Sequence, residues 1–176
     1  MQPANAGRYP RWLHRQCRPA DREERNRNQR DEKHPIVLYG LRHLFAGEHD
    51  ITVAAACLKG EEAMAVAVRE APDVDVMDAD LPDTSGLEFL RAFHKGSPGV
   101  NIVVFTGTIR GDMAAEVISL GVRGIVLKEL PPEVLVRCVR EVHAGHQWIE
   151  RHVAEQAFQA MLAGTCTVSR RARSIS

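Results

Sequence analysis

The chain of 176 residues is 44% hydrophobic and 26% charged, and its formal net charge is zero. This length and composition predict one well-buried domain with appendages, and no apolar run approaches the ~18 residues that a membrane-spanning helix needs. The four cysteines form no Cys-x-x-Cys pair, which argues against a zinc site or a disulfide framework and favours reduced thiols in a cytoplasmic protein.

Charge is distributed unevenly along the chain. Residues 1–34 carry nine Lys or Arg against five Asp or Glu, residues 35–165 carry eleven against eighteen, and the last eleven residues add three arginines and no acid. The body is therefore acidic and both ends are basic. We expect residues 1–30 to be a basic, polar, disordered extension and residues 165–176 to be a solvated basic tail.

From His34 onward, apolar residues follow helical and strand periodicities in alternation. The elements predicted in chain order are a helix from Pro35 to Gly47, a strand at 51–55, a helix at 61–69, a strand at 74–77, a helix at 87–93, a strand at 102–105, a helix at 113–120, a strand at 125–127 and a helix after Pro131-Pro132. Such alternation predicts a parallel sheet with helices on both faces.

An amphipathic helix is expected within residues 148–164, after the alternating elements. Its apolar residues fall on one side: Val153, Ala157, Phe158, Met161 and Leu162. Two interpretations remain open. This side either packs on the domain, or it forms a linker or dimer helix.

Three successive predicted strands end in Asp78, Thr106 and Lys128. Ligands of parallel α/β sheets bind beyond the carboxyl ends of the strands, so these three side chains should meet at one rim. A carboxylate can attack phosphorus when a divalent cation screens its charge. Asp78 and the backbone carbonyl of Asp80 could ligate magnesium, while the hydroxyl and the ammonium balance the phosphoryl oxygens.

The motifs are those of a known family. They comprise His34-Pro35-Ile36-Val37, Met77-Asp78-Ala79-Asp80-Leu81-Pro82 with Gly86, Val104-Phe105-Thr106, Gly121-Val122-Arg123-Gly124-Ile125-Val126-Leu127-Lys128 and His143-Ala144-Gly145. The chain from His34 to about residue 150 resembles the receiver domain of bacterial two-component response regulators, in the LuxR/NarL-type subgroup.

The resemblance implies a flavodoxin-like, three-layer α/β fold over residues 31–147, with a five-stranded parallel sheet in the order 2-1-3-4-5. It also implies that Asp78 accepts a phosphoryl group from a histidine kinase, with Mg²⁺ as cofactor. Thr106 would be the switch hydroxyl, and Lys128 would bind the phosphoryl group.

The sequence departs from the family at the first strand. Family members carry an apolar strand that ends in a pair of acids just before the position of His34, but residues 25–33 contain no apolar residue. Three explanations are open. The N-terminus is a corrupted or alternative one, or the first strand is lost, or a polar segment pairs through its backbone alone. Ungapped matching puts Glu32 and Lys33 at the acid pair. Glu32 remains a candidate magnesium ligand, whereas the positive charge of Lys33 weakens the metal site.

Two further departures concern output. Ile125 stands where the family usually has Tyr or Phe three residues before the lysine, so the coupling to Thr106 would be altered. Only twelve residues follow Gly164, too few for a helix-turn-helix domain. We therefore expect no DNA-binding domain, no direct DNA reading by this chain and no membrane partner, but a homodimer through the C-terminal helix is compatible with the pattern.

Three functional hypotheses follow, and the leading one is a phosphorylatable receiver that is not an enzyme. The second is a pseudo-receiver, a phosphorylation-independent interaction module, which the altered acid pair favours. The third is a haloacid-dehalogenase-type phosphatase, suggested by Asp78-Ala79-Asp80. It ranks last because those enzymes carry the motif on their first strand, whereas the predicted strand at 51–55 precedes it here.

Overall fold

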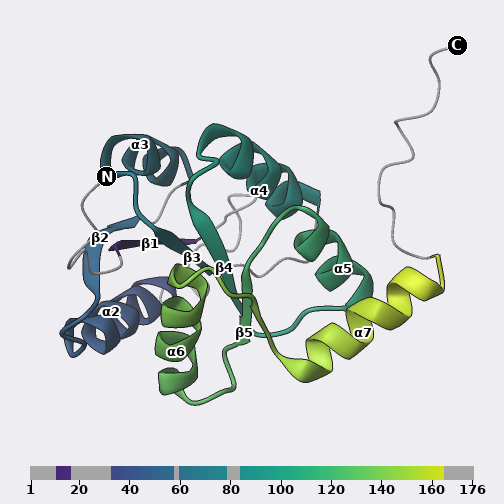
Figure 1. Ribbon diagram of the computed structural model, residues 1–176. Coiled ribbons are helices and arrows are strands. Elements are labelled where there is room, and N and C mark those ends of the chain that lie inside the picture. The colour runs from purple at the N-terminus through teal and green to yellow at the C-terminus, as the bar shows by residue number, and fades with distance from the viewer. Residues whose placement is uncertain (1–10, 17–32, 58–59, 79–83, 165–176) are drawn as a thin grey trace, which may run out of the picture.

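The computed structural model describes residues 11–16, 33–57, 60–78 and 84–164, which form a parallel sheet with helices on both faces (Figure 1). The strands are β1 (Arg11–Gln16), β2 (Thr52–Cys57), β3 (Val74–Asp78), β4 (Asn101–Thr106), β5 (Gly124–Leu127) and β6 (Trp148–Ile149). Their order is β2-β1-β3-β4-β5-β6, and every neighbouring pair is parallel. The predicted α/β class with a parallel sheet is confirmed. The described residues form six strands in this order, where five were predicted in the order 2-1-3-4-5.

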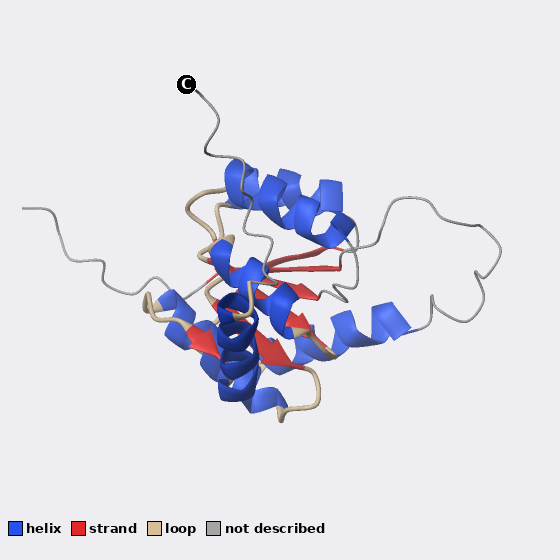
Figure 2. Ribbon diagram, turned by 90° about the vertical axis from the view of Figure 1, so that its right-hand side faces the viewer, coloured by secondary structure: helices blue, strands red, loops and turns tan. Residues whose placement is uncertain are grey.

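Helices lie on both sides of this sheet (Figure 2). They are α2 (Lys33–Ala46), α3 (Gly60–Glu70), α4 (Thr84–Gly96), α5 (Gly111–Ser119), α6 (Pro132–His143) and α7 (Arg151–Leu162). One core cluster joins α2 and α6 to one face of the sheet, and the other joins α3, α4, α5 and α7 to the opposite face. The architecture is thus the three-layer arrangement that the alternating pattern predicts.

Strand β4 shows why the apolar runs form a two-sided sheet. Ile102 and Val104 are buried in the cluster of α3, α4, α5 and α7, whereas Val103 between them is buried in the cluster of α2 and α6. Successive side chains of a strand point to opposite faces, so a strand covered on both faces must be apolar at every position. Residues 102–105 of β4 and 125–127 of β5 satisfy this condition, and their continuous apolar runs were recognisable for that reason.

The first strand lies elsewhere than expected. Arg11–Gln16 takes the place between β2 and β3 and pairs with both, while Lys33 begins α2. Residues 25–32, where the strand was expected, lie outside the described residues. The expectation that residues 1–30 lack structure is therefore wrong for Arg11–Gln16. Pattern reasoning missed the strand because a run with two apolar residues in six does not look like a central strand. Parallel pairing itself, however, uses only backbone N–H and C=O groups.

The rest of the predicted extension, the predicted tail at 165–176 and the acid loop at 79–83 lie outside the described residues. Strand β6 was also not predicted, since two residues are too few to show a periodicity. No described helix has the length and apolar content to cross a bilayer.

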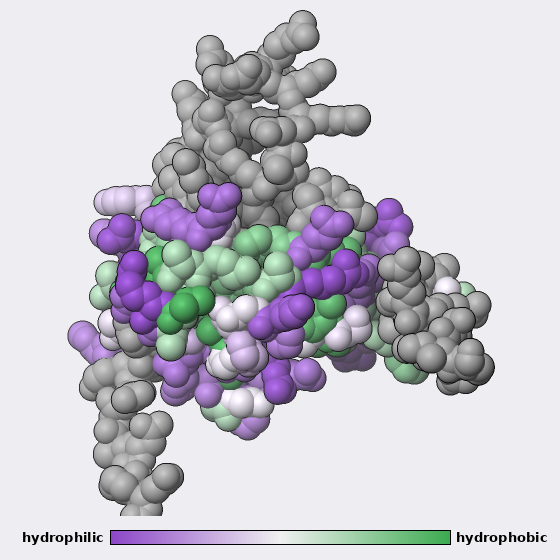
Figure 3. Space-filling model, turned by 90° about the horizontal axis from the view of Figure 1, so that it is seen from above, coloured by the Kyte–Doolittle hydropathy of each residue, from purple (hydrophilic) through white to green (hydrophobic). Residues whose placement is uncertain are grey.

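Figure 3 looks down on α3 and α4 and shows apolar surface between hydrophilic flanks. Val68 of α3 is 71% exposed.

Candidate functional site

The carboxyl ends of β3, β4 and β5 lie side by side at one edge of the sheet. Asp78, the last residue of β3, is the register partner of Phe105, and Thr106, the last residue of β4, is the partner of Leu127. Lys128 follows Leu127 directly. The backbone therefore brings positions 78, 106 and 128 to a single edge formed by three neighbouring strands.

Thr106 is held rigidly at this edge. It is fully buried, and its hydroxyl Oγ1 donates a hydrogen bond of 2.9 Å to the backbone carbonyl of Thr108. Its own carbonyl accepts a 2.8 Å hydrogen bond from the backbone N–H of Lys128. The first bond links the hydroxyl to the turn that follows β4, and the second links the carbonyl of Thr106 to the residue that follows β5.

The half-buried side chain of Lys128 reaches back over β4. Its ammonium nitrogen lies 5.9 Å from the centre of the Phe105 ring, within the range of a cation–π attraction. Phe105 is the residue opposite Asp78 in the register. The positive charge thus lies over the end of β4, the strand next to β3, where it would stabilise a nearby anionic group.

The predicted magnesium ligands are only partly visible. The backbone of Asp78 is described but its side chain is not, and Asp80 and Glu32 lie outside the described residues. Among the residues that are described, no three His, Cys, Asp or Glu side chains cluster as a metal site. Magnesium ligation by Glu32, Asp78 and the Asp80 carbonyl accordingly stays a prediction, as do the roles of Asp78, Thr106 and Lys128.

One of the carboxylates near Asp78 is not at the rim. Asp75 is fully buried in the middle of β3, where its register partners are Leu13 of β1 and Ile102 of β4. A buried carboxylate is costly unless the surroundings compensate its charge. The sign of this burial in the sequence is that Asp75 stands between apolar residues within the predicted strand at 74–77.

Ile125 occupies the interior where the family usually has an aromatic residue. It is completely buried in the cluster that includes Val104, its register partner on β4. An aliphatic side chain therefore fills this position by packing, as predicted.

Helix α7 packs against α5, which supports the packing interpretation for two of the five residues on its apolar side. Val153 and Ala157 are buried in the same core cluster as Ala114 and Val117 of α5, and burial of a valine side chain contributes about 1.5–3 kcal/mol. The other apolar residues remain open to solvent: Phe158 is 58%, Met161 42% and Leu162 67% exposed.

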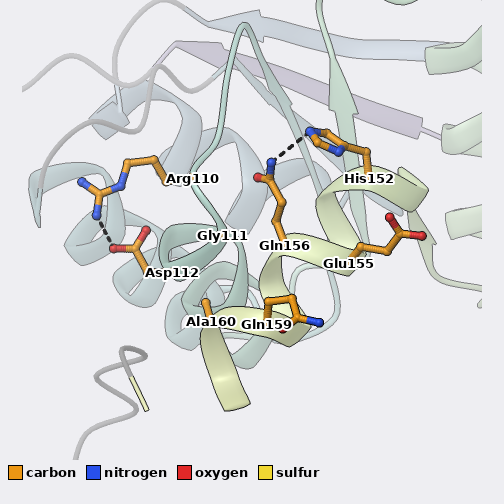
Figure 4. Close-up of a pocket in the computed structure, with 8 residues that line it drawn as sticks. All are labelled: Arg110, Gly111, Asp112, His152, Glu155, Gln156, Gln159 and Ala160. Carbon is orange, nitrogen blue, oxygen red and sulfur yellow. Dashed lines mark hydrogen bonds and ion pairs between the residues drawn. The ribbon is translucent and has the colours of Figure 1, made fainter. Parts of the chain in front are cut away.

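The α5–α7 seam is open at one side (Figure 4). A hollow of about 640 Å³ is lined by Arg110, Gly111, Asp112, His152, Glu155, Gln156, Gln159 and Ala160. Arg110 pairs with Asp112 at 2.5 Å on one side, and His152 contacts Gln156 at 3.0 Å on the other. The sequence pattern did not predict this seam. Its one sign in the sequence is Gly111, the first residue of α5, which permits close helix packing.

A second link joins α6 to the segment that follows α2. The guanidinium of Arg140 donates two hydrogen bonds of 2.7 Å to Asp50 and one of 2.6 Å to Glu48. The hydrogen bond from Arg140 lowers the pKa of the Asp50 carboxyl below its ordinary value of 3.8. The link lies on the surface, away from the edge that carries Thr106 and Lys128.

Comparison with known proteins gives a consistent result. The family model of the response regulator receiver domain matches residues 32–140. The transcriptional activator protein ExaE of Pseudomonas putida is 34% identical over 127 residues, which cover 71% of this chain and 58% of that protein. The response regulator UvrY of Escherichia coli is 28% identical over 125 residues, or 71% and 57% of the two chains. The chain thus spans little more than half the length of these relatives.

Solved structures share the fold. A LuxR-family two-component response regulator from Aurantimonas sp. superimposes with a TM-score of 0.69 at 24% identity, covering 87% of this chain and 98% of that one. The signal receiver domain of a NarL response regulator from Mycobacterium tuberculosis gives 0.62 at 15% identity, covering 78% and 98%.

Proposed function

Because this chain belongs to the response regulator receiver domain family, we propose that it is the receiver module of a two-component phosphorelay and accepts a phosphoryl group on Asp78. The observation that carries the proposal is the alignment of the ends of β3, β4 and β5, with Asp78 opposite Phe105 and Lys128 hydrogen-bonded to Thr106. Receiver domains of response regulators are phosphorylated by histidine kinases, so the donor is a phosphohistidine on such a kinase.

The transfer follows from the residue types. A carboxylate oxygen of Asp78 attacks the phosphorus, a P–O bond forms, the P–N bond of the phosphohistidine breaks, and the departing imidazole takes up a proton. The Thr106 hydroxyl donates to one phosphoryl oxygen and the Lys128 ammonium pairs with another, which stabilises the charge that develops there. Neither residue becomes covalently modified.

Receiver domains typically bind Mg²⁺ at the phosphorylation site, and here the ion would reduce the repulsion between the carboxylate and the phosphoryl group. Asp78 and the backbone carbonyl of Asp80 are its proposed ligands, with Glu32 as a third. Lys33 places a positive charge where the family usually supplies another carboxylate, so we expect weak binding of the ion.

Phosphodonor labelling tests the assignment. The full chain is incubated with Mg²⁺ and acetyl phosphate, and its intact mass is followed. Wild type and the matched control Asp50→Asn should gain one phosphoryl group, whereas Asp78→Asn should gain none. Labelling of Asp78→Asn at the wild-type level would contradict Asp78 as the acceptor.

Failure of every variant to label would favour the second candidate, a pseudo-receiver that binds partners without phosphorylation. The specific observation in its favour is Lys33 at the acid-pair position. The phosphatase hypothesis has less support, since receiver domains are generally signalling modules and Asp78 ends β3, not the first strand. Repeated turnover of a phosphomonoester would contradict this ranking.

A homodimer through α7 is a further part of the proposal. Phe158, Met161 and Leu162 present apolar surface at the end of a helix whose other apolar residues are already buried. Sedimentation velocity should show association that rises with concentration and is weakened by Phe158→Glu but not by the control Gln159→Glu. Identical monomer sedimentation of all three proteins would argue against the dimer.

A further inference from the structure

The strand ends at the carboxyl edge of the sheet carry few acids. In the order β2, β1, β3, β4 and β5, the last residues of the strands are Cys57, Gln16, Asp78, Thr106 and Leu127. The last residue of β6 is apolar as well. Asp78 is therefore the one acid at the ends of the six described strands. A single carboxylate at this edge is an unusual starting point for holding a divalent cation.

The place beside Asp78 belongs to Gln16. The register of the parallel pair β1–β3 sets these two residues against each other, with Arg15 one step earlier on β1. The family ends its first strand with a pair of acids, which ungapped matching assigned to residues 32 and 33. Lys33 instead begins α2, and the strand next to β3 ends in one cation and one neutral amide. β1 thus brings no carboxylate to the edge.

Magnesium fits poorly with this set of strand ends. The ion is held through oxygen atoms, chiefly those of one or two carboxylates and of substrate phosphates, and ligand charge sets the affinity of such sites. Here the one strand-end carboxylate is also the proposed nucleophile, and a glutamine offers only a neutral amide oxygen. The need for the ion is smaller as well. Its task is to screen the phosphoryl group from carboxylate charge, and the strand ends hold one such charge in place of three.

Positive charge comes from the other neighbour of β3. Phe105 of β4 is the register partner of Asp78 on the side away from β1, and the ammonium nitrogen of Lys128 lies 5.9 Å from the centre of its ring. The buried hydroxyl of Thr106 follows directly in the chain. Asp78 therefore lies between a neutral strand end and a strand end that carries a cation and a hydrogen-bond donor.

We propose that phosphoryl transfer to Asp78 proceeds without a divalent cation in this chain, with Lys128 supplying the positive charge. The inference rests on the proposed function in taking Asp78 as the acceptor, and it goes beyond weak binding of Mg²⁺ because the ion becomes unnecessary. With acetyl phosphate as donor, a carboxylate oxygen of Asp78 bonds to phosphorus, the P–O bond to the acetyl group breaks, and acetate leaves with the electron pair. No proton is transferred.

Labelling of the full chain by acetyl phosphate, followed by intact mass, tests the inference in Mg²⁺ and in excess EDTA. Wild type should be labelled at similar rates in both. Gln16→Glu keeps the shape of glutamine but adds a carboxylate beside Asp78. In EDTA it should be labelled about three- to tenfold more slowly than wild type, the range that one nearby charge gives at an edge open to solvent, and Mg²⁺ should restore its rate.

Gln147→Glu is the matched control, because Gln147 is exposed and precedes β6 at the opposite edge of the parallel sheet. It should behave like wild type in both solutions. Wild-type labelling that proceeds in Mg²⁺ and stops in EDTA would overturn the inference and leave the proposed function standing.

Binding of Mn²⁺, followed by the electron paramagnetic resonance of the free ion, gives a readout that needs no phosphoryl transfer. Gln16→Glu should bind the ion about tenfold more tightly than wild type or Gln147→Glu, because it adds a charged ligand. Gln16→Asp gives the same comparison if Gln16→Glu does not fold. If no protein takes a phosphoryl group, the proposed function fails, and Mn²⁺ binding still decides the inference. Equal Mn²⁺ affinity of wild type and the Gln16 variants would overturn it.

Discussion

The backbone N–H of Lys128 donates a 2.8 Å hydrogen bond to the carbonyl oxygen of Thr106, so the two residues proposed to bind the phosphoryl group are joined through the main chain. Because both atoms of this bond belong to the backbone, side-chain substitutions at either position leave it in place. The chemical role of each side chain can therefore be tested without breaking the edge of the sheet.

Lys128→Gln should slow phosphoryl transfer to Asp78 by about tenfold or more, because one positive charge that faces the phosphoryl oxygens is lost. Lys128→Arg keeps the charge and should retain more of the rate. The time course of labelling by acetyl phosphate measures both. If Lys128→Gln were labelled at the wild-type rate, Lys128 would have no role in phosphoryl transfer.

Gly124→Ala should destabilise the fold by about 1–3 kcal/mol through overpacking. The new methyl group would lie 2.7 Å from Cys138 Sγ on α6 and 2.9 Å from Val103 Cγ2 on β4, and both neighbours are buried. Gly99→Ala is the matched control, since nothing lies within 4 Å of its added methyl. Urea unfolding measures the difference, and equal midpoints for the two variants would contradict the packing described at β5.

Arg140→Gln should reduce stability by less than ~1 kcal/mol, because the side chains of Arg140 and Asp50 are 43% and 44% exposed. The lowered pKa of Asp50 determines how the stability contributed by this ion pair changes with pH. Its contribution is present above pH 3.8 and is lost as pH falls below that value, because the unfolded chain takes up the proton before the folded protein does.

The stability difference between wild type and Arg140→Gln should accordingly shrink in acid and in high salt. Arg69→Gln is the control, because Arg69 pairs with its sequence neighbour Glu70 and links no separate elements. Urea denaturation at neutral and acidic pH gives the values. A difference that grows in acid would have the wrong sign for this carboxylate.

Cys138 should resist alkylation in the native protein. Burial raises the pKa of its thiol to about 12, so at pH ~8 roughly one part in ten thousand is thiolate, the reactive form. Iodoacetamide labelling followed by peptide mass spectrometry should show slow reaction at Cys138 and fast reaction in urea.

The same burial predicts a loss of stability in alkali. The unfolded chain ionises this thiol near its ordinary pKa of 9.0, whereas the folded chain does so only at about 12. Stability contributed by the neutral thiol is therefore complete below pH 9.0 and declines as pH rises toward 12. Cys138→Ala should lack this part of the alkaline decline, and equal native and denatured labelling rates would contradict the burial.

The sequence predicted those parts of the fold in which one physical requirement dominates. The middle of β4 and β5 lies between two helical layers and must be apolar. Thr106 and Lys128 stand where each apolar run stops. Helix α7 was visible from its periodicity, and the family inferred from these motifs is confirmed. The ends of the three strands lie side by side, which brings positions 78, 106 and 128 to one edge of the sheet.

Other features depend on contacts that a pattern does not record. β1 is joined to β2 and β3 by backbone hydrogen bonds, which leave little trace in the choice of side chains. Asp75 was expected in a strand, and the full burial of its carboxylate depends on β1 and β4, which pair with β3 on either side. The role of Gly111 depends on Gln156, which is 45 residues away in the chain and has no distinctive residue type.

The position of β1 has a consequence for any shortened form of the protein. Residues 32–140, the part that the family model matches, would leave out the strand that separates β2 from β3. Such a fragment would expose two facing rows of amide and carbonyl groups and should aggregate or swap strands. In a fragment of residues 32–164, which keeps α6, β6 and α7 and lacks only β1 of the described elements, a synthetic peptide spanning Arg11–Gln16 should restore the monomer by strand complementation.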